Sequence, residues 1–146
     1  MENMLRLILI VTNYLALAVL FIAGILGVLI TRGQGFEIHF IASMISLALT
    51  MTGHIGSALY MTLRPVQSRV RIPLIIENFL AAGFYLWATY AGFMIRQGVP
   101  FDYHFSISIS SFVLTTTAHV FSPLFLLLKY KEAGTPADEG AVLAGQ

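Results

Sequence analysis

The chain has 146 residues, of which 58% are hydrophobic and only 10% are charged, and its formal net charge is +1. A soluble domain of this size needs far more charged surface, so the composition indicates an integral membrane protein. The small net charge excludes an electrostatic basis for nucleic-acid binding. The absence of cysteine excludes disulfides, thiolate metal sites and cysteine-ligated iron–sulfur clusters in this chain.

Four apolar segments are long enough to cross a bilayer, which takes roughly 20 helical residues. We place them at about residues 5–31, 36–63, 72–95 and 103–128. The connecting segments are short, which predicts an all-α, antiparallel four-helix bundle within residues 1–131. Residues 132–146 are small, polar and interrupted by glycine and proline, and we predict a disordered cytoplasmic tail there.

The basic residues gather on one side of the predicted bundle. On that side lie Arg6, Arg64, Arg69, Arg71, Lys129 and Lys131. On the other side, Arg32 and Arg96 are accompanied by Glu37 and Asp102. The positive-inside rule then places both termini in the cytoplasm. We therefore predict a multi-pass protein of a bacterial inner membrane, embedded in the lipid bilayer.

One stretch of the chain occurs twice, with an offset of 65 residues. Residues 36–57 read FEIHFIASMISLALTMTGHIGS, and residues 101–122 read FDYHFSISISSFVLTTTAHVFS. The same offset relates Asn13 to Asn78 and Gly27 to Gly92. We therefore predict two repeated helical hairpins, related by an axis along the membrane normal.

All four histidines occupy matched positions of this repeat. His39 and His104 form a first pair, and His54 and His119 form a second pair. Serines and threonines follow between them in steps of three and four residues, which keeps the whole stripe on one helix face. At 1.5 Å per residue, the two pairs lie about 22 Å apart along the helices. A histidine inside an apolar helix usually has a function.

Imidazole is a common axial ligand of haem iron. We therefore predict two low-spin haem b groups, one held between the histidines of each pair. Gly27 and Gly92 would let a porphyrin edge approach the backbone near the first pair. Thr50 and Thr115, one turn before the second pair, would hold the free ring nitrogen and fix the tautomer.

Two further sets of polar residues have two predicted roles each. Asn13 and Asn78 lie near the depth of the second pair, where they would bond haem propionates or each other. Arg32 and Arg96 would pair with the propionates of the haem at the first pair, or would anchor the chain to lipid headgroups.

Other interpretations remain open. Intramembrane histidines often serve as interhelical hydrogen-bond partners, and two histidines can also ligate zinc or copper. As a non-redox membrane anchor, the chain would tether a partner through its loops and tail. As a small transporter or proton channel, it would use histidines that titrate, and parallel repeats do occur in transporters.

The histidine pattern resembles the N-terminal haem-binding core of respiratory and photosynthetic cytochromes b. In that family, paired histidines about fourteen residues apart on two helices hold two haems in series, and glycines on the first and third helices face the porphyrins. The matching residues in this chain are His39, His54, His104 and His119, with Gly27 and Gly92 as the glycines.

The resemblance implies a minimal dihaem cytochrome b that conducts electrons across the membrane. The quinol-site loop and the later helices of the larger family members are absent. The chain is therefore expected to be an electron-transfer subunit of an oxidoreductase complex rather than a catalyst alone. Its expected partners are quinone and a peripheral iron–sulfur, flavin or c-type cytochrome subunit.

Overall fold

Four long helices make up most of the described chain. The computed structural model describes residues 2–30, 36–64, 66–98 and 100–133. The helices are α1 (Glu2–Ile30), α2 (Phe36–Leu63), α3 (Arg71–Met94) and α4 (Phe101–Ala133), and a short 3-10 helix, η1 (Ile95–Gln97), follows α3. All four long helices have the length and apolar composition needed to cross a membrane, as the sequence predicts.

Helix α4 extends past the apolar run at which the sequence-based prediction ends it. Tyr130 is buried and packs against Tyr60 of α2 with ring centroids 5.1 Å apart. Its hydroxyl donates a hydrogen bond to the carbonyl of Arg64. These contacts attach the last turns of α4 to the end of α2. The predicted tail lies outside the described residues from residue 134 onward.

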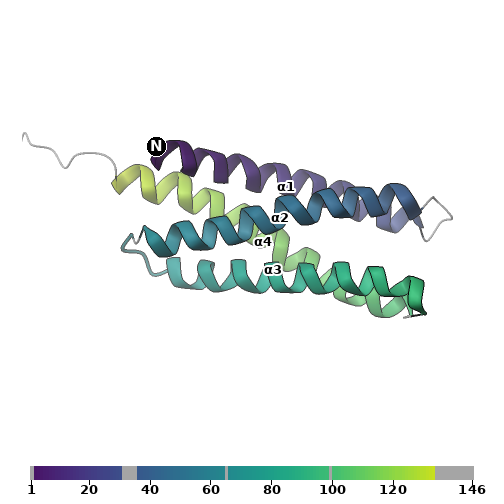
Figure 1. Cartoon of the computed structure of the whole chain (residues 1–146). Helices are drawn as coiled ribbons and strands as arrows, with labels where there is room; N and C mark the ends of the chain where they lie inside the picture. Colours follow the sequence, from purple (N-terminus) through teal and green to yellow (C-terminus); the bar gives the residue numbers. More distant parts are fainter. Residues whose placement is uncertain (1, 31–35, 65, 99, 134–146) are drawn as a thin grey trace, which may run out of the picture.

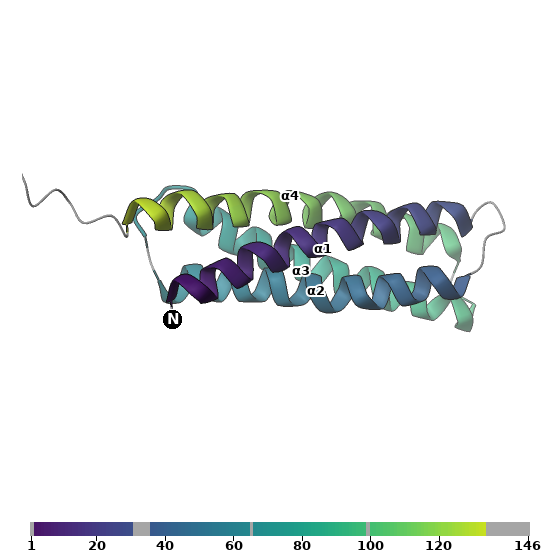
Figure 2. The ribbon, with the colours of Figure 1, turned by 90° about the horizontal axis from the view of Figure 1, so that it is seen from above.

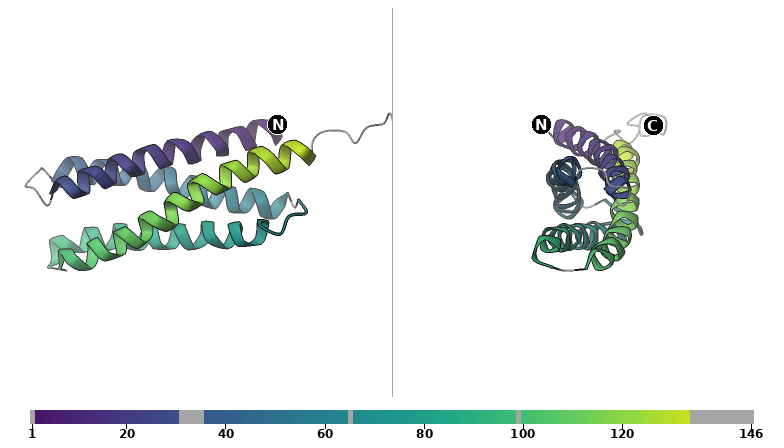
Figure 3. Two further views of the ribbon diagram at one scale, coloured as in Figure 1. Left: turned by 180° about the vertical axis from the view of Figure 1, so that it is seen from behind. Right: turned by 90° about the vertical axis from the view of Figure 1, so that its right-hand side faces the viewer.

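The helices are arranged as a ring. In Figure 1 the sequence runs one way along α1 and α3 and the other way along α2 and α4. Figure 2 shows the same helices from above, with the start of α1 and the end of α4 at one end of the molecule. Each helix packs against two neighbours, whereas α2 and α4 lie on a diagonal and touch at few places. The end-on view in Figure 3 shows this arrangement.

The outward faces are apolar and much of the interior is polar. Large side chains such as Ile25, Ile41 and Phe93 are exposed, whereas Ser46 and Thr50 are fully buried. Small and hydroxylated residues are typical of the contacts between membrane helices, and apolar side chains suit contact with lipid. This surface supports contact of the helices with a bilayer.

The end of the bundle at which α1 starts and α4 finishes is filled by apolar side chains. Met61 and Leu126 are completely inaccessible there. We call this set the terminal apolar cluster, and its buried members are Leu9, Ile10, Tyr60, Met61, Leu74, Phe125, Leu126 and Tyr130.

Candidate functional site

The first histidine pair lies near the opposite end of the bundle. His39 and His104 belong to the two diagonal helices, α2 and α4, and both are partly buried. They line one shared cavity of about 710 Å³, a volume within the usual range of small-molecule sites. All four long helices contribute side chains to its lining.

Each imidazole of the first pair is held by a backbone carbonyl 16 residues earlier. Nδ1 of His39 donates to the carbonyl of Ala23 at 3.0 Å, and Nδ1 of His104 donates to the carbonyl of Ala88 at 3.0 Å. A proton on Nδ1 leaves the lone pair of Nε2 available, which is the state in which a histidine ligates a metal. The carbonyl also fixes the orientation of the ring.

Gly27 and Gly92 make room for these two rings. A Cβ atom placed on Gly27 would lie 3.1 Å from Cε1 of His39, and one on Gly92 would lie 2.8 Å from Cε1 of His104. The sequence-based prediction assigned this space to a porphyrin edge. In the structure both glycines line the cavity, and the groups closest to their Cα hydrogens are the imidazoles.

Two serines lie beside the same rings, one turn further along each helix. Oγ of Ser43 is 3.4 Å from Nε2 of His39, and Oγ of Ser108 is 3.4 Å from both ring nitrogens of His104. Hydrogen bonds of this length are weak. They therefore leave Nε2 available to a stronger ligand.

The residues around the first pair fit a haem. The remaining lining of the cavity is mainly apolar, and none of its described side chains is charged, which suits a flat apolar macrocycle. Phe36 and Phe101 flank His39 and His104 at ring-centroid distances of 6.4 and 6.2 Å. Two imidazoles with available Nε2 atoms form the donor set of a bis-histidine iron.

The two imidazole rings of the second pair stack directly on each other. The ring centroids of His54 and His119 lie 4.1 Å apart and the ring planes differ by 17°, and both residues are completely buried. Two histidines that ligate one haem iron have the macrocycle between them. Rings stacked face to face leave no space for it, so the second pair does not fit a haem in this structure.

Asn13 and Asn78 hold the second pair in a crossed arrangement. Nδ1 of His119, on α4, donates to Oδ1 of Asn13, on α1, at 2.8 Å. Nδ1 of His54, on α2, donates to Oδ1 of Asn78, on α3, at 3.0 Å. The asparagines therefore bond the histidines of the second pair and not each other, unlike one of their predicted roles.

The amide nitrogens of the two asparagines complete the arrangement. Nδ2 of Asn13 donates to Oγ of Ser57 at 2.9 Å, and Nδ2 of Asn78 donates to Oγ of Ser122 at 2.6 Å. Both amides also donate to a carbonyl four residues earlier. Loss of one partner of a buried hydrogen bond costs about 1–3 kcal/mol. We call the set the histidine–asparagine network, and its members are His54, His119, Asn13, Asn78, Ser57 and Ser122.

The two threonines near the second pair are placed differently. Oγ1 of Thr50 lies 3.3 Å from Nε2 of His119, a ring nitrogen of the second pair. Oγ1 of Thr115 and Nε2 of His54 are buried and have no hydrogen-bond partner among the described residues. The tautomer at this level is set by the asparagines, because they accept the Nδ1 protons.

The predicted arginine partners are not part of the described site. Arg32 lies outside the described residues, and of Arg96 only the backbone in η1 is described. Within the described part of the chain, no three histidine, aspartate or glutamate side chains gather as a metal-binding group. A zinc or copper ion at either pair would therefore have two protein ligands there.

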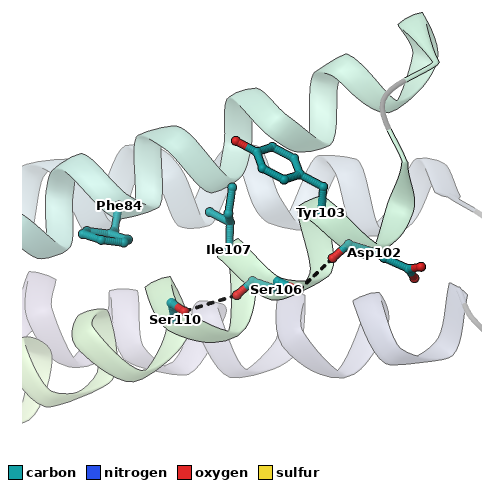
Figure 4. A pocket seen from close by; sticks show the side chains of 6 residues that line it. All are labelled: Phe84, Asp102, Tyr103, Ser106, Ile107 and Ser110. Atoms are coloured by element: carbon teal, nitrogen blue, oxygen red, sulfur yellow. Dashed lines mark hydrogen bonds between the residues drawn. The ribbon is translucent and has the colours of Figure 1, made fainter.

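A second hollow, of about 430 Å³, lies on the outside of α3 and α4 (Figure 4). Its serine hydroxyls are satisfied within α4, since Ser106 donates to the carbonyl of Asp102 at 2.9 Å and Ser110 to that of Ser106 at 3.2 Å. The hydroxyl protons of these two serines are therefore already used within the helix. Its lining residues are Phe84, Asp102, Tyr103, Ser106, Ile107 and Ser110.

Sequence reasoning missed two sets of partners. Ser57 and Ser122 lie on the predicted polar stripe, and their offset of 65 could have identified them as partners of the similarly matched asparagines. The carbonyls of Ala23 and Ala88 have no signature in the sequence, because every residue offers a carbonyl. Comparison with protein-family models, with curated proteins and with solved structures finds no match for this chain.

Proposed function

We propose that this chain is an electron-transfer subunit of the membrane that holds a b-type haem between His39 and His104. The proposal rests on one observation, the hydrogen bonding and the apolar surroundings of the two histidines of the first pair. Two imidazoles on diagonal helices, each with its Nδ1 proton bonded to a carbonyl at 3.0 Å, line the same apolar cavity. This arrangement supplies two unprotonated Nε2 atoms in a site of low polarity.

The haem, when bound, supplies a one-electron redox couple. The chain itself supplies binding, orientation and the exclusion of water. His39 and His104 ligate the iron, and the carbonyls of Ala23 and Ala88 orient the rings. The apolar lining keeps water and counter-charges away from the site, and such surroundings control a cofactor's redox potential.

Electron transfer needs a donor and an acceptor outside this chain. We propose quinone or a peripheral redox subunit of the iron–sulfur, flavin or c-type cytochrome class in these roles. Both are compatible with a site near one end of the bundle, from which an electron can pass to a partner at the membrane surface.

The sequence also predicts a second haem at His54 and His119, which would extend the electron path across the membrane. The contact between these two rings does not support it. We therefore assign no electron-transfer step to the second pair.

Absorbance spectra of the purified full-length chain test the proposed function. After reconstitution with haemin, we expect a b-type absorbance spectrum whose bands sharpen on reduction with dithionite. The spectrum of the oxidised form is expected to return on reoxidation. The low-spin form is expected because both axial positions are occupied by imidazole. A chain that folds and binds no haem would exclude this function.

We also infer the finer arrangement of the fold, an antiparallel bundle of two repeated hairpins. The offset of 65 relates the bond from His39 to Ala23 to the bond from His104 to Ala88. It likewise relates the bond between Asn13 and Ser57 to its counterpart in α3 and α4. Equivalent bonds at equivalent positions are expected of two copies of one structural unit.

The basic end of the bundle is inferred to face the cytoplasm of a bacterial cell. Arg64, Arg69 and Arg71 lie in or beside the connection between α2 and α3, at the end where α1 starts and α4 finishes, and positive charge marks the cytoplasmic side.

A labelling experiment tests this orientation. Because the chain has no cysteine, Ser68→Cys introduces a single thiol for labelling in the connection between α2 and α3. A membrane-impermeant maleimide is expected to modify it only in inverted vesicles. Modification in intact cells would reverse the assignment.

A further inference from the structure

The first and second histidine pairs lie at two levels of the bundle. The residues of α1 and α3 that lie beside the imidazole rings differ between these levels. Gly27 and Gly92 lie under the first pair. Asn13 and Asn78 precede these glycines by 14 residues on the same helices, which is within about 40° of a whole number of turns. The asparagines therefore occupy, at the second level, the helix face that the glycines occupy at the first. An asparagine side chain that makes three hydrogen bonds thus stands at the second level, where the first level has a glycine without a side chain.

The direction of the Nδ1 bonds also differs between the levels. At the first level, each histidine bonds a carbonyl of the helix that precedes its own in sequence. At the second level, His54 of α2 reaches to α3 and His119 of α4 reaches to α1. These crossed bonds bring the two rings over the centre of the bundle, where they stack at 4.1 Å.

The surroundings of the second level are also closely filled by side chains. The terminal apolar cluster lies between this level and the nearer end of the bundle, and Met61 and Leu126 are completely buried in it. At the first level, by contrast, the two histidines line a cavity of about 710 Å³. Nε2 of His54 is without a hydrogen-bond partner among the described residues, but His54 is completely buried and its ring is stacked on that of His119.

We infer that the second pair is a structural clamp between the α1–α2 and α3–α4 helix pairs, and that the chain binds one haem and not two. The inference rests on the proposed function of the first pair. His54 and His119 hold the helix pairs together through the crossed bonds to Asn78 and Asn13. They are not iron ligands, which separates this chain from the dihaem arrangement that its histidine spacing predicts.

The test is a haem count on the full-length chain, reconstituted with excess haemin and freed of unbound haem. Pyridine haemochrome absorbance per chain is expected to give one haem. His54→Gln and His119→Gln are expected to keep that haem and its spectrum, with a lower midpoint of thermal unfolding. The matched variants His39→Gln and His104→Gln are expected to lose the haem.

The outcomes separate this inference from the proposed function. Two haems per chain would overturn the clamp and leave the proposed function standing. No haem would overturn both. A single haem that is lost in His54→Gln but kept in His104→Gln would place the ligands at the second pair, and it would overturn both the clamp and the proposed haem site at the first pair. If the second-pair variants do not fold, the count on the unaltered chain decides alone.

Discussion

Replacement of His104 with alanine is expected to abolish tight haem binding, and His39→Ala is expected to have the same effect. Each change removes one of the two imidazoles that line the shared cavity, so the iron would lose one of its two proposed protein ligands. The small side chain leaves the cavity open, and free imidazole added to the buffer is expected to restore part of the low-spin spectrum. Haem absorbance per chain, measured with and without imidazole, checks the prediction.

Ser106→Ala is the matched control for this experiment. Ser106 lies on the same helix, is exposed, and bonds only the carbonyl of Asp102. The Ser106→Ala variant should bind haem as the unaltered chain does. Full haem occupancy in both histidine variants, with the low-spin spectrum unchanged and without added imidazole, would mean that the ligands lie elsewhere.

Gly92→Ala is expected to lower haem occupancy severalfold. The added methyl group would lie 2.8 Å from Cε1 of His104, closer than a Cβ atom can approach a ring. The imidazole would have to turn away, and its bond to the carbonyl of Ala88 would lengthen or break. Because that bond fixes the ligating nitrogen, the variant should bind haem more weakly and show a mixed high- and low-spin spectrum. Titration with haemin, followed by absorbance, measures both changes.

Gly83→Ala controls for the general effect of alanine on α3. No atom lies within 4 Å of a Cβ placed on Gly83, so the change adds a methyl group without a clash. Alanine is the better helix former by about 1 kcal/mol, and this variant should be at least as stable as the unaltered chain. Equal haem affinity in the two glycine variants would show that His104 tolerates displacement.

The sequence was sufficient to predict the helices and their inward faces. Long apolar runs fix the number of membrane-length helices, and the spacing of His39, Ser43, Ser46 and Thr50 fixes which face they share. These are properties of a single helix, so they do not depend on its neighbours. Ser46 and Thr50 are completely buried, as the stripe predicts.

The closure of the second pair could not be predicted in the same way. The spacing from His39 to His54 equals the spacing from His104 to His119, so the histidine spacing makes the two helices alike and does not show which pair closes. Whether two rings meet or face a cavity depends on which acceptor each Nδ1 proton finds. At the first level the acceptor is a carbonyl, and at the second it is the amide of Asn13 or Asn78. That choice depends on side-chain torsions and on the approach of neighbouring helices.

The crossed bonds have a consequence for how the protein enters the membrane. When α1 and α2 have been inserted, the amide nitrogen of Asn13 can already donate to Ser57, but the partner of its oxygen in the complete bundle, His119, is missing until α4 arrives. Polar groups without partners in lipid are unfavourable by several kcal/mol each. The first half of the protein is therefore incomplete in the bilayer, and translation of the last helix both supplies the missing partner and locks the two halves in register.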